Sequence, residues 1–243
     1  MPFTLDAFYS PEDARRVRRV LRKLAEHQMD RWALTGGLAI EVHLVSAGSE
    51  PSIRQLNDID FIAPWFEAIA PSLGRELLFR HVHPSDPPGK TLLQAIDPET
   101  KVRIDVFHAY GSEMERAVPV EIEGLALRMV SLPDLVARHT RLNWDLIEGQ
   151  ALAPKYARDL LRLLESSSGS EVGKVWPEHR KSKMPESFEA ACERVREAIR
   201  KRPDLLVHPA YSTKVGEICD RCKVVNDFPL ADAGHILSIL GYC

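Results

Sequence analysis

Three aspartates have the residue type and the spacing that could bind a metal ion. Asp58 and Asp60 lie two residues apart in a segment, residues 58–62, that alternates as a β-strand does. Because neighbouring strand residues point to opposite faces, both carboxylates are expected on one face. Asp105 lies in a second apolar strand, residues 103–107. If the two strands are neighbours, the three carboxylates converge, and because carboxylates are costly to bury without a counter-charge, the pattern then predicts a site for a hard divalent cation such as Mg²⁺.

A pair of glycines upstream could bind phosphate. Thr35-Gly36-Gly37 follows a short apolar run and precedes a segment of helical character, residues 38–44. Glycine lets the backbone approach a ligand closely, and a helix N-terminus offers free N–H groups to an anion. A simple turn is the alternative interpretation. Together with two metal ions on the aspartates, this turn could serve an attack on a phosphate with pyrophosphate as the leaving group.

Four cysteines suggest a second, incomplete metal site. Cys219 and Cys222 have the spacing of a zinc knuckle, with His235 and Cys243 as candidates for the other two Zn²⁺ ligands. His208 is held in reserve. Packed or exposed thiols are the favoured alternative. The spread of the cysteines does not indicate a disulfide framework.

The elements that must position these residues alternate between strands and helices before a helical C-terminal half. Ser10 and Pro11 predict the start of a helix, and Asp97-Pro98-Glu99-Thr100 predicts a hairpin turn. Residues 166–170 have the composition of a flexible linker. Strands are expected at 32–35, 58–62, 79–83, 92–96, 102–107 and within 118–129. Helices are expected at 65–78 with a break near Pro71, from 132 onward with Leu142 on its apolar face, at 154–165 and at 186–200.

The composition is that of an ordinary globular protein. Of 243 residues, 44% are hydrophobic and 28% are charged, and the formal net charge is −3. This balance excludes binding of nucleic acid by bulk charge alone, and collagen-like or disordered classes are excluded too. No run approaches the ~20 apolar residues of a membrane helix, and the N-terminus lacks a signal-peptide pattern, so a cytoplasmic protein without a membrane partner is expected. The basic run from Arg15 to Lys23 indicates a solvated helix face, with a polyanion contact as the alternative.

The order of these motifs resembles the nucleotidyltransferase superfamily with the DNA polymerase β-like catalytic fold. The matching residues are Gly36-Gly37, Asp58-Ile59-Asp60 and Asp105. Within it, residues 34–40 and 54–61 look most like the bacterial AbiEii/AbiGii abortive-infection toxins. The resemblance covers about residues 30 to 165. It departs from the pattern where many relatives carry Ser or Thr directly after the first or the second glycine, because Gly37 and Leu38 stand at those positions.

The resemblance implies a role for each matching residue. Asp58 and Asp60 would bind two Mg²⁺ ions, and Asp105 would complete the metal site and help to deprotonate an acceptor hydroxyl. Thr35, Gly36 and Gly37 would form the nucleotide-binding turn. Lys155, which precedes Asp159, would neutralise triphosphate charge, although an exposed lysine at a helix start is an equal alternative. Arg54 can pair with phosphate or an acid, but a solvated loop arginine is the favoured interpretation.

These expectations combine into one main hypothesis. The chain is expected to have an α+β fold, a mixed sheet with flanking helices and then a helical region. Residues 1–130 would be catalytic, residues 131–202 would close the cleft, and residues 203–243 would carry the cysteines. The enzyme would transfer a nucleoside monophosphate, such as that of ATP, from a nucleoside triphosphate to a hydroxyl of RNA or tRNA, a small molecule or a protein. A toxin role would imply a cognate antitoxin. A non-catalytic nucleotide-binding or protein-interaction module is the alternative.

Overall fold

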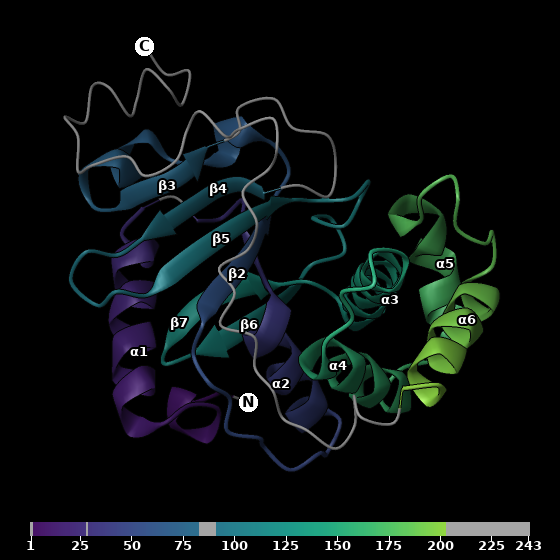
Figure 1. Ribbon diagram of the computed structural model, residues 1–243. Helices are drawn as coiled ribbons and strands as arrows, with labels where there is room; N and C mark the ends of the chain where they lie inside the picture. The colour runs from purple at the N-terminus through teal and green to yellow at the C-terminus, as the bar shows by residue number, and fades with distance from the viewer. Residues whose placement is uncertain (1, 28, 83–90, 203–243) are drawn as a thin grey trace. The chain divides into compact units, whose positions relative to one another are not determined.

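The described part of the chain contains one mixed sheet and a set of helices. The computed structural model describes residues 2–27, 29–82 and 91–202. Within them the strands form a seven-stranded sheet in the order β3-β4-β5-β2-β1-β7-β6 (Figure 1). This confirms the α+β class expected from the sequence. The strands are β1 (Ala33–Thr35), β2 (Asp58–Ala63), β3 (Leu78–Val82), β4 (Thr91–Ile96), β5 (Arg103–His108), β6 (Val118–Ile122) and β7 (Leu125–Met129).

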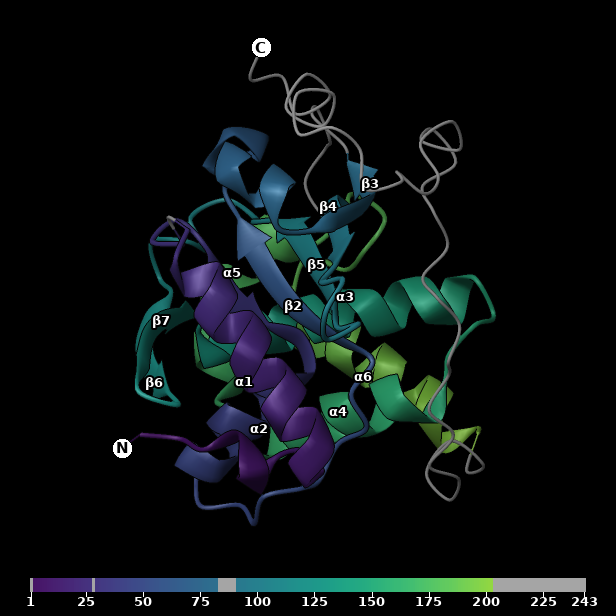
Figure 2. The same cartoon turned by 90° about the vertical axis from the view of Figure 1, so that its left-hand side faces the viewer.

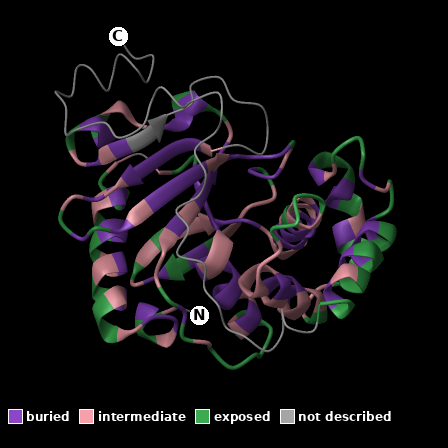
Figure 3. Cartoon of the chain, in the orientation of Figure 1, coloured by how far each residue is buried: buried purple, intermediate pink, exposed green. Residues whose placement is uncertain are grey.

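The strand pairings explain why the sheet is mixed. β2 lies parallel to β5 and antiparallel to β1, whereas β1 runs parallel to β7. β4 and β5 pair antiparallel, as the hairpin prediction requires, and so do β6 and β7. The central strands are mostly buried (Figure 3). The sheet therefore gives β2 and β5 a neighbour on each side and fixes the register between them.

Helix α1 (Pro11–Ala25) packs on the sheet through one apolar stripe (Figures 1 and 2). Ser10 caps it as predicted, because the Ser10 side chain accepts a hydrogen bond from the Asp13 N–H, 3.2 Å away. The stripe consists of Ala14, Val17, Val20, Leu21 and Leu24, all fully buried. This burial at helical spacing is what holds α1 against the strands.

Most basic residues of α1 are engaged in ion pairs. Arg16 pairs with Asp13, Arg18 with Asp6 and Glu123, Arg19 with Glu99, and Lys23 with Asp97. This agrees with the interpretation of the run as a helix face rather than a surface for a polyanion.

Four helices of the second half pack on one another. They are α3 (Leu132–Glu148), α4 (Pro154–Glu165), α5 (Gly169–His179) and α6 (Phe188–Arg200). α3 contacts the other three, and Trp176 of α5 meets Phe188 of α6 edge-on, with ring centroids 5.9 Å apart. The prediction of Leu142 on the apolar face is wrong, because Leu142 is exposed and Asn143 is buried instead.

Two stretches differ from the sequence prediction. The linker predicted at 166–170 is short, because α5 begins at Gly169. The glycines and Pro177 of α5 do not favour a helix in the sequence, but burial of Val172 and Trp176 stabilises it. The helix expected at 65–78 is absent, and two 3-10 segments, Phe66–Ala68 and Pro71–Arg75, stand there. The expected break near Pro71 is present, because Pro71 begins the second segment and prevents a continuous helix.

The described residues form two compact units. One comprises residues 2–27, 29–41, 51–82 and 91–130, and the other comprises residues 42–50 and 131–202. Helix α2 (Gly36–Ser46) contributes its first residues to one unit and its last to the other. In the part of the chain that the structure describes, every helix is too short or too polar to cross a membrane.

Candidate active site

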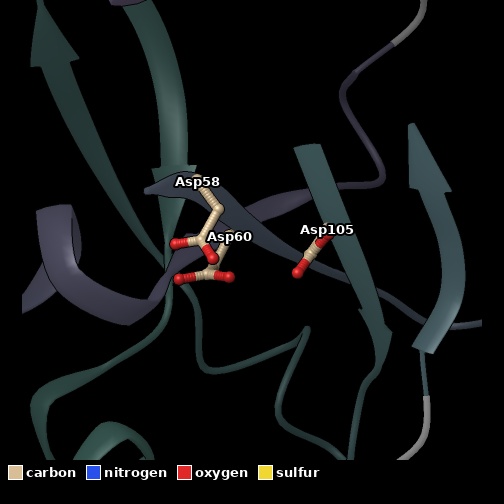
Figure 4. A group of neighbouring side chains, drawn as sticks. All are labelled: Asp58, Asp60 and Asp105. Atoms are coloured by element: carbon tan, nitrogen blue, oxygen red, sulfur yellow. The ribbon is translucent and has the colours of Figure 1, made fainter. Parts of the chain in front are cut away.

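The structure brings the three predicted aspartates together. Asp60 of β2 is the register partner of Asp105 of β5. Each of Asp58, Asp60 and Asp105 offers a carboxylate oxygen, and these oxygens lie within 4.8 Å of one another. In Figure 4 the side chains of Asp58 and Asp60 lie side by side on one strand, and that of Asp105 comes from the neighbouring strand. We call these three residues the acid cluster.

The burial of strand β2 follows from its alternation. Ile59 and Phe61 are buried on the opposite face, each 1% exposed, whereas Asp58 and Asp60 are only partly buried. Phe61 contacts the Trp32 ring, with centroids 5.5 Å apart. The apolar half of β2 thus fixes the strand in the core, and the strand period then turns both carboxylates to the same face.

The glycine turn lies directly against the acid cluster. Thr35 at the end of β1 is the register partner of Asp60, and α2 begins at the next residue. Gly36 has a φ of 63°, and a Cβ atom on it would overlap with the Asp60 carboxylate. Only glycine fits both the backbone conformation and this close approach. The N-terminal turn of α2, with its N–H groups, therefore lies next to Asp60.

Arg103 forms part of the same site, although none of the sequence motifs pointed to it. It is the register partner of Asp58, and its Nη2 donates a hydrogen bond to Asp58 Oδ2. The same nitrogen lies 3.2 Å from Asp105 Oδ2. Its position two residues before Asp105 on one strand was the available signal, because that spacing puts both side chains on one face.

Arg103 is held as a cation. Burial by itself lowers the pKa of its guanidinium, but Asp105, Asp58 and Asp60 outweigh that effect and raise the pKa above the ordinary value. The Nε atom of Arg103 is buried and makes no hydrogen bond within the described part of the chain. The acid cluster therefore already holds one fixed positive charge.

The expectation for Arg54 is wrong, because Arg54 is not a solvated loop residue. It is 8% exposed, and its Nη1 donates to Oε1 of the fully buried Glu41 at 3.0 Å. A Cβ atom on Gly37 would lie 3.0 Å from Arg54 Nε, so the guanidinium packs on the glycine turn. Glu41 within the apolar first turns of α2 was the sequence signal, because a buried acid needs a cationic partner.

The N-terminal segment supports this arrangement. The Arg54 N–H donates to the Phe8 carbonyl at 2.7 Å, and Tyr9 forms an isolated bridge with Arg54. Burial raises the pKa of the Tyr9 hydroxyl, with the nearby acids adding to the rise and Arg54 opposing it. The Tyr9 hydroxyl therefore stays protonated near neutral pH and adds no charge beside the acids.

The donor set of the acid cluster fits a hard divalent cation. Three carboxylates from two adjacent strands place oxygen atoms around a common point, and oxygen is the ligand that Mg²⁺ prefers. The guanidinium of Arg103 among them shows that the position attracts positive charge. The set contains no sulfur or nitrogen donor that would favour a softer metal.

The other predicted site residues belong to the second unit or lie outside the described residues. Lys155 lies in the first turn of α4, in the second unit, with its Nζ 5.8 Å from the Tyr156 ring centroid. Its nucleotide-binding role stays a prediction. The zinc candidates Cys219, Cys222, His235 and Cys243, together with His208, lie outside the described residues.

Comparisons with known proteins add a likeness of fold. No protein-family model and no curated protein matches the chain. Among solved structures, it is similar to the antibiotic-resistance factor ANT(2'')-Ia in solution, at 13% identity over 78% of this chain and 95% of that one, with a TM-score of 0.46. It is also similar to ANT(2'')-Ia in complex with adenylyl-2''-tobramycin, at 15% identity over 77% of this chain and 96% of that one, with a TM-score of 0.41.

A third structure is an antigenic nucleotidyltransferase-like protein from Paracoccidioides brasiliensis. It is 17% identical over 79% of this chain and 90% of its own, with a TM-score of 0.43. These three structures thus comprise two of ANT(2'')-Ia and one of a nucleotidyltransferase-like protein. At these identities and TM-scores the likeness says nothing of substrate, and the chemistry must come from the residues of this chain.

Proposed function

We propose that the chain is a Mg²⁺-dependent nucleotidyltransferase that transfers a nucleoside monophosphate from a nucleoside triphosphate to an acceptor hydroxyl. The observation that carries the proposal is the contact between the two predicted motifs: the Gly36 turn abuts Asp60, and Asp60 is paired in register with Asp105. A phosphate at the start of α2 would therefore lie beside the carboxylates that hold the metal ions.

Each residue takes one part of the reaction. Asp58 and Asp60 would bind both metal ions, and Asp105 would complete the set and accept the proton of the attacking hydroxyl. The N–H groups of Gly36 and Gly37 would orient the terminal phosphates. When bound, the metal ions supply charge neutralisation for the phosphates and the leaving pyrophosphate. The protein thus contributes position and electrostatics rather than a covalent intermediate.

The proposal also concerns which molecule carries the acceptor hydroxyl. The resemblance of the glycine and Asp-x-Asp segments implies RNA or tRNA, together with a toxin role and a cognate antitoxin. The basic run of α1 gives it little support, because four of its residues already pair with acids of the same chain. A hydroxyl of a small molecule or of a protein side chain is the other class of acceptor to test.

A thermal-unfolding experiment tests nucleotide and metal without knowledge of the acceptor. Wild type is melted with each of the four ribonucleoside triphosphates, with and without Mg²⁺, beside Asp58→Asn. A ligand at about 100 times its dissociation constant adds roughly 2.7 kcal/mol of stability. We expect a Mg²⁺-dependent shift in wild type that Asp58→Asn abolishes.

The control is Asp6→Asn, which removes an exposed carboxylate that pairs with Arg18 outside the site. It should keep the full nucleotide shift. The proposal fails if no nucleotide shifts the wild-type transition, or if Asp58→Asn shifts as much as wild type does.

Leu38 favours one second candidate, a nucleotide-binding module without catalysis. It is 3% exposed and stands where a hydroxyl residue would add a phosphate contact. A triphosphate labelled at the α-phosphate separates the two candidates. Covalent transfer of label to RNA, protein or a small molecule supports the enzyme, whereas binding without any transfer supports the module.

A further inference from the structure

We propose that Arg103 is an internal counter-ion that competes with metal ions for the acid cluster and thereby sets the metal affinity of the site. In the metal-free protein its guanidinium neutralises Asp58 and Asp105. A bound metal ion requires Arg103 to release them. This inference rests on the proposed metal centre, and it concerns a residue of this chain to which the motifs assign no role.

The strand register places Arg103 between two of the acids. Asp58 lies beside Arg103 across the parallel pair, and Asp105 lies two residues further along β5 on the same face. One nitrogen, Nη2, contacts Oδ2 of both carboxylates. These acids are 16% and 8% exposed at the side chain, so water screens their charge only weakly.

A metal ion and this guanidinium compete for the same carboxylates. Oxygens that coordinate Mg²⁺ directly cannot keep a hydrogen bond from Nη2 along the same direction. Arg103 cannot avoid this competition by losing a proton, because the acids raise the pKa of its guanidinium and arginine stays charged in proteins. Two adjacent cations repel each other, so metal binding must displace the guanidinium.

Arg103 lies at the start of its strand and is partly exposed. It is the first residue of β5, and Lys101, two residues earlier, lies outside the strand in a left-handed conformation with a φ of 59°. The side chain of Arg103 is 16% exposed, so part of it reaches solvent. Its Nε atom forms no hydrogen bond in the described structure, so the contacts with the acids that displacement would break are those of Nη2.

The test compares metal binding in the full-length chain without nucleotide. Arg103→Met keeps the length of the side chain and removes its charge. Free Mn²⁺ is followed by electron paramagnetic resonance during titration of the metal-free protein. We expect Arg103→Met to bind Mn²⁺ at least about tenfold more tightly than wild type, which corresponds to about 1.4 kcal/mol. Arg103→Lys keeps a positive charge on a shorter side chain, so its Mn²⁺ affinity should fall between those of wild type and Arg103→Met.

A second readout protects the test against simple misfolding. Without metal, Arg103→Met should unfold at a lower temperature than wild type, because the three carboxylates then repel one another. Saturating Mn²⁺ should raise its unfolding temperature by more than that of wild type. The matched control is Arg18→Met, which removes a 24%-exposed guanidinium paired with Glu123 at 2.7 Å; it should bind Mn²⁺ as wild type does.

The outcomes separate this inference from the proposed function. Equal or weaker Mn²⁺ binding by Arg103→Met overturns the competition while leaving the metal centre in place, since weaker binding would mean that Arg103 shapes the site for the ion. If neither protein binds Mn²⁺ at millimolar concentration, the metal centre and the inference fail together. Binding by Arg103→Met alone would be the strongest support.

Discussion

The acids around Lys23 and the acids around Arg103 illustrate the difference between a structural and a functional carboxylate. At the β4–β5 turn, Lys23 contacts Asp97 at 2.7 Å, Glu99 at 3.4 Å and Glu76 at 3.8 Å. A few residues later, Arg103 contacts Asp58 and Asp105 beside Asp60. Each cation is thus shared among acids, but the surroundings of those acids are not alike.

Burial is what distinguishes the two groups. Around Lys23 only Asp97 is buried, and Glu99 and Glu76 are 49% and 43% exposed, so water stabilises the surplus negative charge. Asp97 is further satisfied by Thr100, whose N–H and hydroxyl donate to Oδ2 at 2.9 and 2.5 Å. In the acid cluster Asp105 is buried, and Asp58 and Asp60 are both partly withdrawn from water. A surplus of negative charge that water stabilises only in part is therefore the sign of a site built for an added cation.

The largest expected difference is in metal-free stability. Asp97→Asn leaves Lys23 and Thr100 facing an amide and should lower the free energy of unfolding by about 3 kcal/mol. Asp58→Asn removes one of several crowded carboxylates while Arg103 keeps Asp105, so its effect should stay below about 1 kcal/mol. Urea unfolding in the presence of a chelator measures both. A loss at Asp58 as large as that at Asp97 would mean that the acid cluster is structural.

A second pair of variants, Gly36→Ala and Gly124→Ala, compares a glycine beside the acid cluster with a glycine in open space. Gly36→Ala should cost about 2 kcal/mol or more, because it adds a collision with Asp60 to the strain of a positive φ. Gly124→Ala has the same type of strain, with a φ of 76° and no atom within 4 Å, and should cost about 1 kcal/mol. Gly36→Ala should also lose the Mg²⁺-dependent nucleotide shift, which Gly124→Ala should retain. If both variants lost the same stability and both kept the nucleotide shift, the glycine turn would not be part of the nucleotide site.

Local sequence signals predicted the strands and the spacing of the acids. The alternation in residues 58–62 and 103–107 is short-range, so it placed Asp58 and Asp60 on one face without knowledge of the sheet. The Ser10 cap and the hairpin turn are local in the same sense. Figure 4 shows the outcome, with the three predicted aspartates brought together.

The partners of these acids could not be predicted in the same way. Which residue faces Asp58 depends on the parallel register of β2 and β5, and a shift of one residue would replace Arg103 by Val102 or Ile104. Arg54 meets Glu41 through a loop whose path is fixed by long-range contacts with Phe8 and Tyr9. Cation partners are therefore a tertiary property, whereas the strand pattern of the acids is local.

Acid pH offers a third way to separate the groups. Burial alone would raise the pKa of Asp97, but hydrogen bonds from Lys23 and Thr100 bring it below its ordinary value of 3.8. A depressed pKa means that the stabilisation is complete above pH 3.8 and is lost as the pH falls through the lower, folded-state pKa. We expect the stability gap between wild type and Lys23→Met to narrow as the pH falls below that value. A gap that stays constant from pH 6 to pH 2.5 would show that Lys23 acts through packing alone.

The smallest effect belongs to an exposed pair on the same helix. Arg19 contacts Glu99 at 2.9 Å, but the two side chains are 62% and 49% exposed. Water and salt screen such a pair, so Arg19→Met should change the free energy of unfolding by about 0.5 kcal/mol or less. Thermal unfolding at low and high salt measures it, and the difference from wild type should vanish at high salt. Because Lys23 lies one turn further along α1 and shares Glu99, a large effect at Arg19 would mean that the exposed acids carry the stability assigned here to buried Asp97.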